Sequence, residues 1–421
     1  MLSRLARRLG TGRAVLLLRL VQYPVVVLLR LVERLLPLDE HRVVFGAASD
    51  RFADNAAYAF IAASRTQGRA LEPIWITGSP KVAARLRADG LRVAMRWSLE
   101  GLYLAGTAAV FVVSTYRSDV NHFLGHRALL VNLWHGVPIK RIERDIEGGP
   151  LAVLNRWRDR DSLVGRALAV DLGTPDHLVS PSPFVTESCL LTAFGIGEDR
   201  CWNLGYPRND HLDPTAAAQL PSPALIADTE LWQALAGRRV VGFFPTWRDQ
   251  GGSVLDLGAL SIQQLAAVLA EQGTTLLYKP HYNDPPMTVT APGLVVLEPD
   301  EDVHAYLSVC DVLVTDYSSL AVDFALTGRP IIHFVPDLAS YEETRGFYFH
   351  PSTLNSGVLV TTAAELLDAL DRTGRGERLP GDPGAVASKF WGERYDFRSC
   401  ERLVARLERA RTERVRPAVA T

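Results

Sequence analysis

Short apolar runs alternate along the chain with amphipathic stretches, and this alternation predicts the secondary structure. Runs rich in valine, isoleucine and leucine are typical of parallel strands, which are covered on both faces. We expect helices at 55–67, 81–89, 363–373 and 395–414. We expect strands at 42–46, 73–77, 92–95, 109–114, 129–133, 179–182, 200–204, 240–244, 275–279, 294–297, 312–315, 331–335 and 358–360. The pattern therefore predicts an α/β protein with two doubly wound, Rossmann-like sheets.

A proline- and alanine-rich stretch separates the two halves of this pattern. We expect a first domain at 39–212, a linker at 213–236 and a second domain at 237–421 that includes the C-terminal helix. A chain of 421 residues has the length of two α/β domains. Two domains joined by a linker leave a cleft, which is a favoured place for a ligand.

The segment 1–38 has a different pattern, because it is both leucine-rich and basic. Its residues 1–36 hold seven arginines against one acidic residue, Glu33. The longest uncharged piece, 20–29, is about half of what a membrane span requires, and no signal-peptide cleavage site follows it. We therefore expect an amphipathic helix on an anionic membrane surface. Packing of this helix on the protein's own core is the alternative.

Composition and charge narrow the class of protein. The net charge of −2 argues against a general nucleic-acid binder. The four cysteines form no CxxC pair, which is typical of free thiols in a reducing compartment and favours a cytoplasmic location. The sequence has no GxxxxGK[ST], HExxH, GxSxG or EF-hand motif and no evident cluster of metal ligands, so we expect neither a metal nor another cofactor.

The stretch 311–337 reads as strand, helix and strand, and it predicts a phosphate site. Asp316, Ser318 and Ser319 follow a buried strand and begin a helix, where unpaired backbone N–H groups attract anions. Asp323 shares their helix face and could accept hydrogen bonds from a ribose. The alternative is that Ser318 only caps the helix.

His135 also stands at the carboxyl end of an expected strand, followed by Gly136, which lets a ligand approach the backbone closely. A neutral imidazole at that place could take a proton from a hydroxyl nucleophile. A structural role is the alternative, since a single histidine at a strand end is commonly structural.

Two further strand ends carry groups suited to phosphate. Lys279 and His281 follow one strand and could neutralise a diphosphate. Thr246 and Arg248 follow another and could donate hydrogen bonds to phosphate, with Trp247 as a wall or stacking surface. Solvated basic side chains at a turn, and a tryptophan in an ordinary core, are the alternatives.

Taken in order, these segments resemble a known family. The set WHGVPIK (134–140), SPSPFVTES (180–188), GYPRND (205–210), FPTWRD (244–249), KPH (279–281), DYSS (316–319) and RGFYF (345–349) resembles the CDP-glycerol glycerophosphotransferases of teichoic acid synthesis. The resemblance implies a GT-B fold with an acceptor-side first domain and a nucleotide-side second domain. It also implies transfer of glycerol phosphate from CDP-glycerol to a hydroxyl of a lipid-linked acceptor, with release of CMP.

By the same resemblance, His135 looks like the general base and His281 like the partner of the donor's diphosphate. Ser318 and Ser319 look like phosphate ligands. The donor side would further hold Thr246, Arg248, Lys279, Asp316 and Asp323, and the acceptor side Gly136 and Lys140.

Family members act on undecaprenyl-linked substrates at the inner membrane face, which fits a peripheral protein with a basic N-terminal segment. Val137 and Ile139 depart mildly from the family's first motif. The chain resembles the short members that add a first unit more than the long polymerases. A CDP-ribitol donor, a glycosyltransferase acting on a nucleotide sugar, and a non-catalytic polymer-assembly protein are the alternatives.

Overall fold

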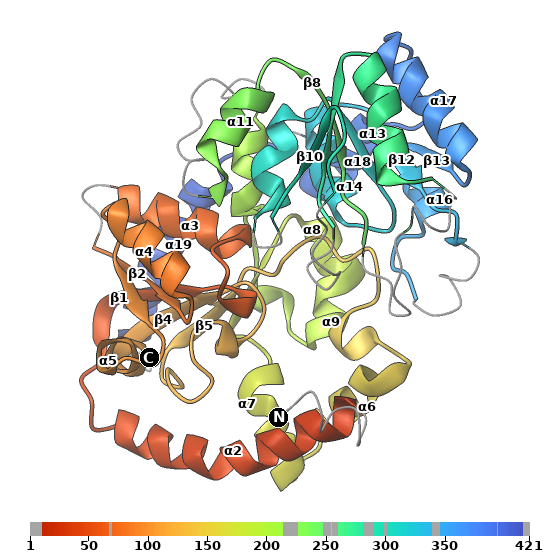
Figure 1. Ribbon diagram of the computed structural model, residues 1–421. Helices are drawn as coiled ribbons and strands as arrows, with labels where there is room; N and C mark the ends of the chain where they lie inside the picture. The colour runs from red at the N-terminus through yellow and green to blue at the C-terminus, as the bar shows by residue number, and fades with distance from the viewer. Residues whose placement is uncertain are drawn as a thin grey trace. The chain divides into compact units, whose positions relative to one another are not determined.

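The computed structural model describes residues 11–66, 70–213, 226–246, 254, 260–280, 289–298, 301–338, 346–393 and 395–415. The chain forms two compact units. The first comprises Met1–His135, Arg141–Arg208 and Arg398–Thr421, and the second comprises Gly136–Lys140 and Asn209–Phe397. Each unit is built on one parallel sheet (Figure 1), so the expected pair of parallel α/β sheets is confirmed.

The sheet of the first unit has seven parallel strands in the order β3-β2-β1-β4-β5-β6-β7. The order of the strands reverses between β1 and β4. Ligands of such sheets bind at the carboxyl ends of the strands near this reversal. The strands are β1 (Asp39–Gly46), β2 (Glu72–Thr77), β3 (Val93–Met95), β4 (Ala108–Val113), β5 (Leu129–Asn132), β6 (His177–Ser180) and β7 (Cys201–Asn203).

Helices cover this sheet, and aromatic side chains fill the layer beneath α3. The rings of Phe60 and Trp75 lie 5.5 Å apart, and both residues are fully buried. The helices are α2 (Thr11–Glu33), α3 (Asp54–Arg65), α4 (Pro80–Ala88), α5 (Leu99–Thr107), α6 (Gly149–Arg158), α7 (Leu163–Leu172), α8 (Pro183–Val185), α9 (Leu191–Phe194) and α19 (Ser399–Val415). Short 3-10 turns include Arg117–Asp119, Glu143–Asp145 and Pro207–Leu212, and a π-helix spans Thr186–Leu190.

The C-terminal helix α19 differs from the sequence-based expectation, which assigned 237–421 to the second domain. It belongs to the first unit, where it packs on α3 and β1. Leu403, Val404 and Leu407 form its fully buried face, and the guanidinium of Arg402 donates to the carbonyl of Leu204 at 2.8 and 3.0 Å. The apolar periodicity predicts a buried helix face, but it carries no information about which sheet the face covers.

The second unit has six parallel strands in the order β10-β9-β8-β11-β12-β13, with the turn-back between β8 and β11. The strands are β8 (Arg239–Phe243), β9 (Thr274–Tyr278), β10 (Leu294–Val296), β11 (Val312–Thr315), β12 (Ile331–Phe334) and β13 (Val358–Val360). The helices are α11 (Thr229–Leu235), α13 (Ile262–Glu271), α14 (Leu320–Phe324), α16 (Pro351–Leu354), α17 (Ala363–Gly374) and α18 (Pro383–Trp391), with a 3-10 helix at Val303–Val309.

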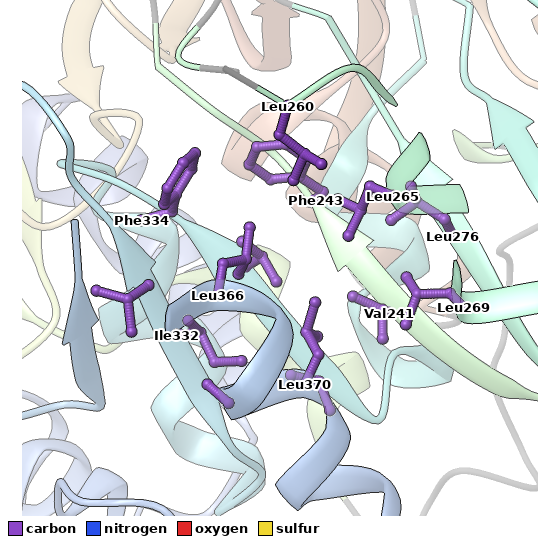
Figure 2. Packing of buried hydrophobic residues seen from close by; sticks show 14 of the residues in the cluster. Val241, Phe243, Leu260, Leu265, Leu269, Leu276, Ile332, Phe334, Leu366 and Leu370 are labelled. Carbon is purple, nitrogen blue, oxygen red and sulfur yellow. The ribbon is translucent and has the colours of Figure 1, made fainter. Parts of the chain in front are cut away.

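Figure 2 shows the core on one face of this sheet, where α13 and α17 meet the strands. Both helices begin with reciprocal capping boxes, Ser261 with Gln264 and Thr362 with Glu365. These caps fix the start of each helix and therefore which side chains face the sheet. The core residues labelled in the figure are Val241, Phe243, Leu260, Leu265, Leu269, Leu276, Ile332, Phe334, Leu366 and Leu370.

The long helix α2 lies within the segment 1–38 and runs through Pro24. It packs against α6 and α7 (Figure 1). Among the residues that the structure describes, no helix is both long enough and apolar enough to cross a membrane.

Candidate active site

His135 stands in a turn directly after β5 that is held in an unusual conformation. Trp134 has φ 52° and Gly136 has φ 146°, values that favour glycine, so the turn needs outside support. The side chain of Asn132 accepts a hydrogen bond from the Trp134 N–H at 2.8 Å. The side chain of Asn55, on α3, donates to the Trp134 carbonyl at 2.8 Å. Two buried amides thus hold the turn that presents His135.

The surroundings of His135 favour the neutral form of its imidazole. The ring hydrogen-bonds the backbone of Ser114 at the end of β4, so one nitrogen donates and the other keeps its lone pair. The residue keeps an exposed surface, but the protein around the ring displaces much of its water. This desolvation is the main reason that the pKa of His135 lies below its usual value of 6.5; Asp54 opposes the shift and Arg208 adds to it.

Arg208 is the cation that positions this turn. Its side chain is only 2% exposed, and its Nη1 lies 2.8 Å from the Asp54 carboxylate and 2.8 Å from the carbonyl oxygen of His135. Its backbone N–H donates to Asn55 at 3.2 Å. One guanidinium therefore joins α3 to the backbone of the candidate base.

A second carboxylate, Glu143, also raises the pKa of His135, although less than desolvation lowers it. The Tyr116 hydroxyl donates to Glu143 at 2.5 Å, and Arg158 pairs with Glu143 at 3.2 Å. Glu143 and Asp54 have φ 48° and 63°. Left-handed conformations of non-glycine residues cost about 1–3 kcal/mol each, and they cluster at functional sites. Their position around His135 therefore supports a functional role.

Sequence reasoning did not identify Asp54, Glu143 or Arg208 as site residues. Arg208 stands in the GYPRND segment, and this motif is the sequence signal that points to it. Asp54 and Glu143 stand outside every quoted motif. Only the fold brings their carboxylates near His135.

In the second unit, the carboxylate of Asp316 is hydrogen-bonded to backbone N–H groups. The residue is 1% exposed, and its carboxylate accepts the backbone N–H groups of Thr246, at 3.0 Å, and Tyr317, at 2.7 Å. This carboxylate thus joins the loop after β8 to the loop after β11. Asp316 shapes the expected donor side, and the Thr246 side chain is left partly exposed beside it.

Ser318 and Ser319 stand at the start of α14, as the sequence predicts, and both are partly exposed. The Ser318 hydroxyl oxygen accepts the Leu320 N–H at 3.2 Å, which is the capping role held open as the alternative. A capping hydroxyl still has its own O–H to donate. Capping and phosphate binding are therefore compatible at Ser318.

Asp323 and Lys279 are more enclosed than the expected donor-side roles imply. Asp323 is fully buried, with Asn209 donating to one carboxylate oxygen at 2.9 Å and His304 Nε2 3.2 Å from the other. It contacts these side chains where a ribose hydroxyl was expected. Lys279 is 9% exposed, and its ammonium donates to the carbonyl of Glu301.

The acceptor-side residues Gly136 and Lys140 belong to the second unit, although the sequence placed them in the first domain. Lys140 forms an antiparallel bridge with Phe347, and the Ile139 carbonyl accepts the Tyr348 N–H at 2.8 Å. Two of the quoted motifs are therefore paired through their backbones. His281, Arg248 and Trp247 lie outside the described residues.

In the part of the chain that the structure describes, no group of three or more His, Cys, Asp or Glu side chains is arranged to hold a metal ion. The four cysteines are free thiols.

Comparison with known proteins identifies the family. The sequence model described as CDP-Glycerol:Poly(glycerophosphate) glycerophosphotransferase matches residues 28–409. The chain belongs to this family. The resemblance drawn from the seven motifs is thereby confirmed.

Members of the glycerophosphotransferase family from two bacteria are similar to this chain. The teichoic acid poly(glycerol phosphate) polymerase of Bacillus subtilis (strain 168) is 29% identical over 72% of this chain and 40% of that protein. The teichoic acid glycerol-phosphate transferase of Staphylococcus aureus (strain NCTC 8325 / PS 47) is 31% identical over 58% of this chain and 62% of that protein. The chain thus spans less than two thirds of the length of these relatives.

The solved structure of the wall teichoic acid polymerase TagF has a similar fold. The two superpose with a TM-score of 0.67 over 90% of this chain and 91% of the TagF chain, at 20% identity. This likeness shows a GT-B-like fold. Another TagF structure is of a variant soaked with CDPG.

Proposed function

We propose that this glycerophosphotransferase family member transfers glycerol phosphate from CDP-glycerol to a hydroxyl of a lipid-linked acceptor, releasing CMP. The product would be teichoic acid or a related cell-surface polymer. Family membership supports the reaction class, and the TagF variant soaked with CDPG supports the donor. The single observation that carries the proposal is His135 in a strained turn, where Asn55 and Arg208 donate to the carbonyls of Trp134 and His135.

In this mechanism the acceptor hydroxyl gives its proton to the free ring nitrogen of His135. The oxygen attacks the β-phosphorus, which bears the glycerol. The bond from that phosphorus to the bridging oxygen breaks, and the bridging oxygen leaves with CMP. The hydroxyls of Ser318 and Ser319 would bind donor phosphate, and the cations of Lys279 and His281 would balance its charge.

The test compares His135→Ala with the native chain, using CDP-glycerol and a lipid-linked acceptor, and measures released CMP. We expect CMP release to fall by at least about a hundred-fold, which is typical for loss of a general base. His41→Ala is the matched control, because His41 is an exposed histidine of the same unit. Full turnover by His135→Ala would refute the mechanism.

The same assay distinguishes the donor and the bond that is broken. Parallel reactions with CDP-ribitol test the polyol. Release of a nucleoside diphosphate from a nucleotide sugar would instead indicate glycosyl transfer. Absence of turnover with every donor would favour the non-catalytic assembly role.

We also propose that α2 rests on an anionic membrane surface at the cytoplasmic face. The helix exposes Val21, Leu28 and Leu31 by 75%, 61% and 53%. Two of its arginines contact the protein: Arg19 lies 3.1 Å from His122, and Arg30 lies 3.1 Å from His126. A helix that exposes aliphatic side chains in this way can insert them at the boundary between headgroups and acyl chains. The undecaprenyl-linked acceptor would lie in the same membrane.

A further inference from the structure

The second unit contains a cavity of about 680 Å³ at the amino ends of its strands. Arg239 begins β8, Asp311 precedes β11, and Arg329 lies two residues before β12; all three line the cavity. The start of α14 follows the carboxyl end of β11. The cavity therefore lies at the amino ends of the strands, whereas the proposed phosphate ligands lie at the carboxyl ends.

The charge of this cavity is unbalanced. Arg238, Arg239 and Arg329 line it together with a single carboxylate, Asp311. Over the described ranges none of the three arginines is ion-paired with an acidic side chain. One oxygen of Asp311 is also occupied, because it accepts the Val240 N–H at 2.8 Å.

Two of these guanidiniums are fixed by neutral acceptors. Arg239 donates to Thr274 at 3.0 Å and to Thr373 at 2.9 Å. Arg329 donates to the carbonyls of Ser308 and Cys310, each at 2.7 Å. These bonds orient the planar groups without neutralising them. Each guanidinium keeps further N–H donors for a ligand.

We propose that this cavity is a second anion site and that it binds a phosphomonoester. Arginine matches the geometry of phosphate oxygens, and a charge-assisted hydrogen bond is stronger than a neutral one. A phosphomonoester carries about −1.5 to −2 charges near neutral pH, which balances three guanidiniums against one carboxylate. The volume is that of a small-molecule site, and Trp232 supplies an apolar wall beside the charges. Binding of an anion at this cavity does not require the proposed transferase activity.

Arg238 is the arginine to substitute, because its side chain is exposed. Arg239 and Arg329 also form hydrogen bonds within the unit, so their loss would affect folding as well as binding. Calorimetric titration of the full chain with inorganic phosphate and with glycerol 3-phosphate would measure the affinity. We expect a Kd of about 1 mM or tighter. The Arg238→Glu variant should weaken binding by at least about ten-fold, because it removes one charged donor and adds a repelling carboxylate.

Arg378→Glu is the matched control, since Arg378 is an exposed arginine of the same unit that does not line the cavity. It makes the same change in net charge and should leave the affinity unchanged. Binding of inorganic phosphate alone would identify a free-anion site, and preference for glycerol 3-phosphate would identify an organic phosphate; both support the proposal. Equal affinity in all three proteins, or no binding at about 10 mM ligand, would overturn it.

Discussion

At the scale of single residues, the protonation state of His135 decides whether it can act as a base. The surrounding protein lowers its pKa below 6.5, and the carboxylates of Asp54 and Glu143 keep the shift from being larger. As the pH falls through this lowered pKa, the ring gains a proton and the lone pair is lost. At a pH somewhat below 6.5, where an ordinary histidine is mostly protonated, we therefore expect His135 to keep its lone pair.

This shift predicts the pH dependence of the reaction. We expect kcat/KM to stay constant as the pH is lowered past 6.5 and to fall only at a lower pH. A pH series of CMP release from the native chain measures the position of this acid limb. A limb centred at or above 6.5 would contradict the desolvation of His135.

A second prediction concerns Arg208, which contacts the backbone of His135 and which we expect to act as a positioning residue. Arg208→Gln should lower kcat by at least about ten-fold, since the His135 carbonyl loses a charged donor. It should also destabilise the fold by about 2 kcal/mol, because Asp54 loses its charged partner. Urea unfolding and CMP release measure the two effects.

The double variant Arg208→Gln with Asp54→Asn separates these roles. Removing the unpaired carboxylate should recover part of the stability but not the activity. If kcat recovers together with stability, Arg208 is only structural.

At the scale of elements, the segment Glu301–His304 joins the loop after β9 to α14. The Glu301 carbonyl accepts from Lys279 after β9. His304 lies 3.1 Å from Asp302 and 3.2 Å from Asp323, so its ring links this segment to α14. A histidine between two carboxylates thus holds α14 from the side, near the helix's carboxyl end.

This arrangement predicts a selective effect on the donor. His304→Leu removes the hydrogen bond to Asp323, and a bond to a carboxylate is worth about 1.5–3 kcal/mol. We expect the KM for CDP-glycerol to rise by about ten-fold or more, with a smaller change in kcat. His304→Gln keeps one donor and should restore part of the affinity. A fall in kcat with unchanged KM would exclude this positioning role.

The placement of α19 leads to a prediction about stability. Leu407 is fully buried in the first unit, so Leu407→Ala should cost about 2–5 kcal/mol of unfolding free energy. Arg409→Ala, at an exposed position of the same helix, should cost far less. Denaturant unfolding measures both. Equal stability of the two variants would contradict the packing of α19.

These elements also show what a sequence can predict. Every strand of both sheets was anticipated, because a parallel strand covered on both faces is a continuous apolar run such as 108–113. The start of α14 and the strand-end position of His135 followed from the same pattern. The assignment of α19, the burial of Asp323 and the carboxylates near His135 depend on contacts between distant parts of the chain, which no local pattern contains.

At the scale of the whole molecule, α2 predicts binding to membranes. Leu28→Glu combined with Leu31→Glu places two charges on its exposed face and should weaken binding to anionic liposomes by at least about ten-fold. Co-sedimentation with vesicles measures this binding. Val268→Glu, on an exposed part of α13 in the second unit, is the control. Equal binding of the double variant and the native chain would refute the membrane role of α2.

The interleaving of the two units along the chain has a consequence for biosynthesis. The first unit begins at the N-terminus, yet α19 reaches it only from Arg398 onward. The whole of the second unit is therefore synthesised before the first unit is complete. Synthesis of the first unit begins first and ends last. A chain that terminates before α19 leaves the surface of the first unit that α19 covers exposed to solvent. The stability of the first unit thus depends on a helix that is synthesised after the whole of the second unit.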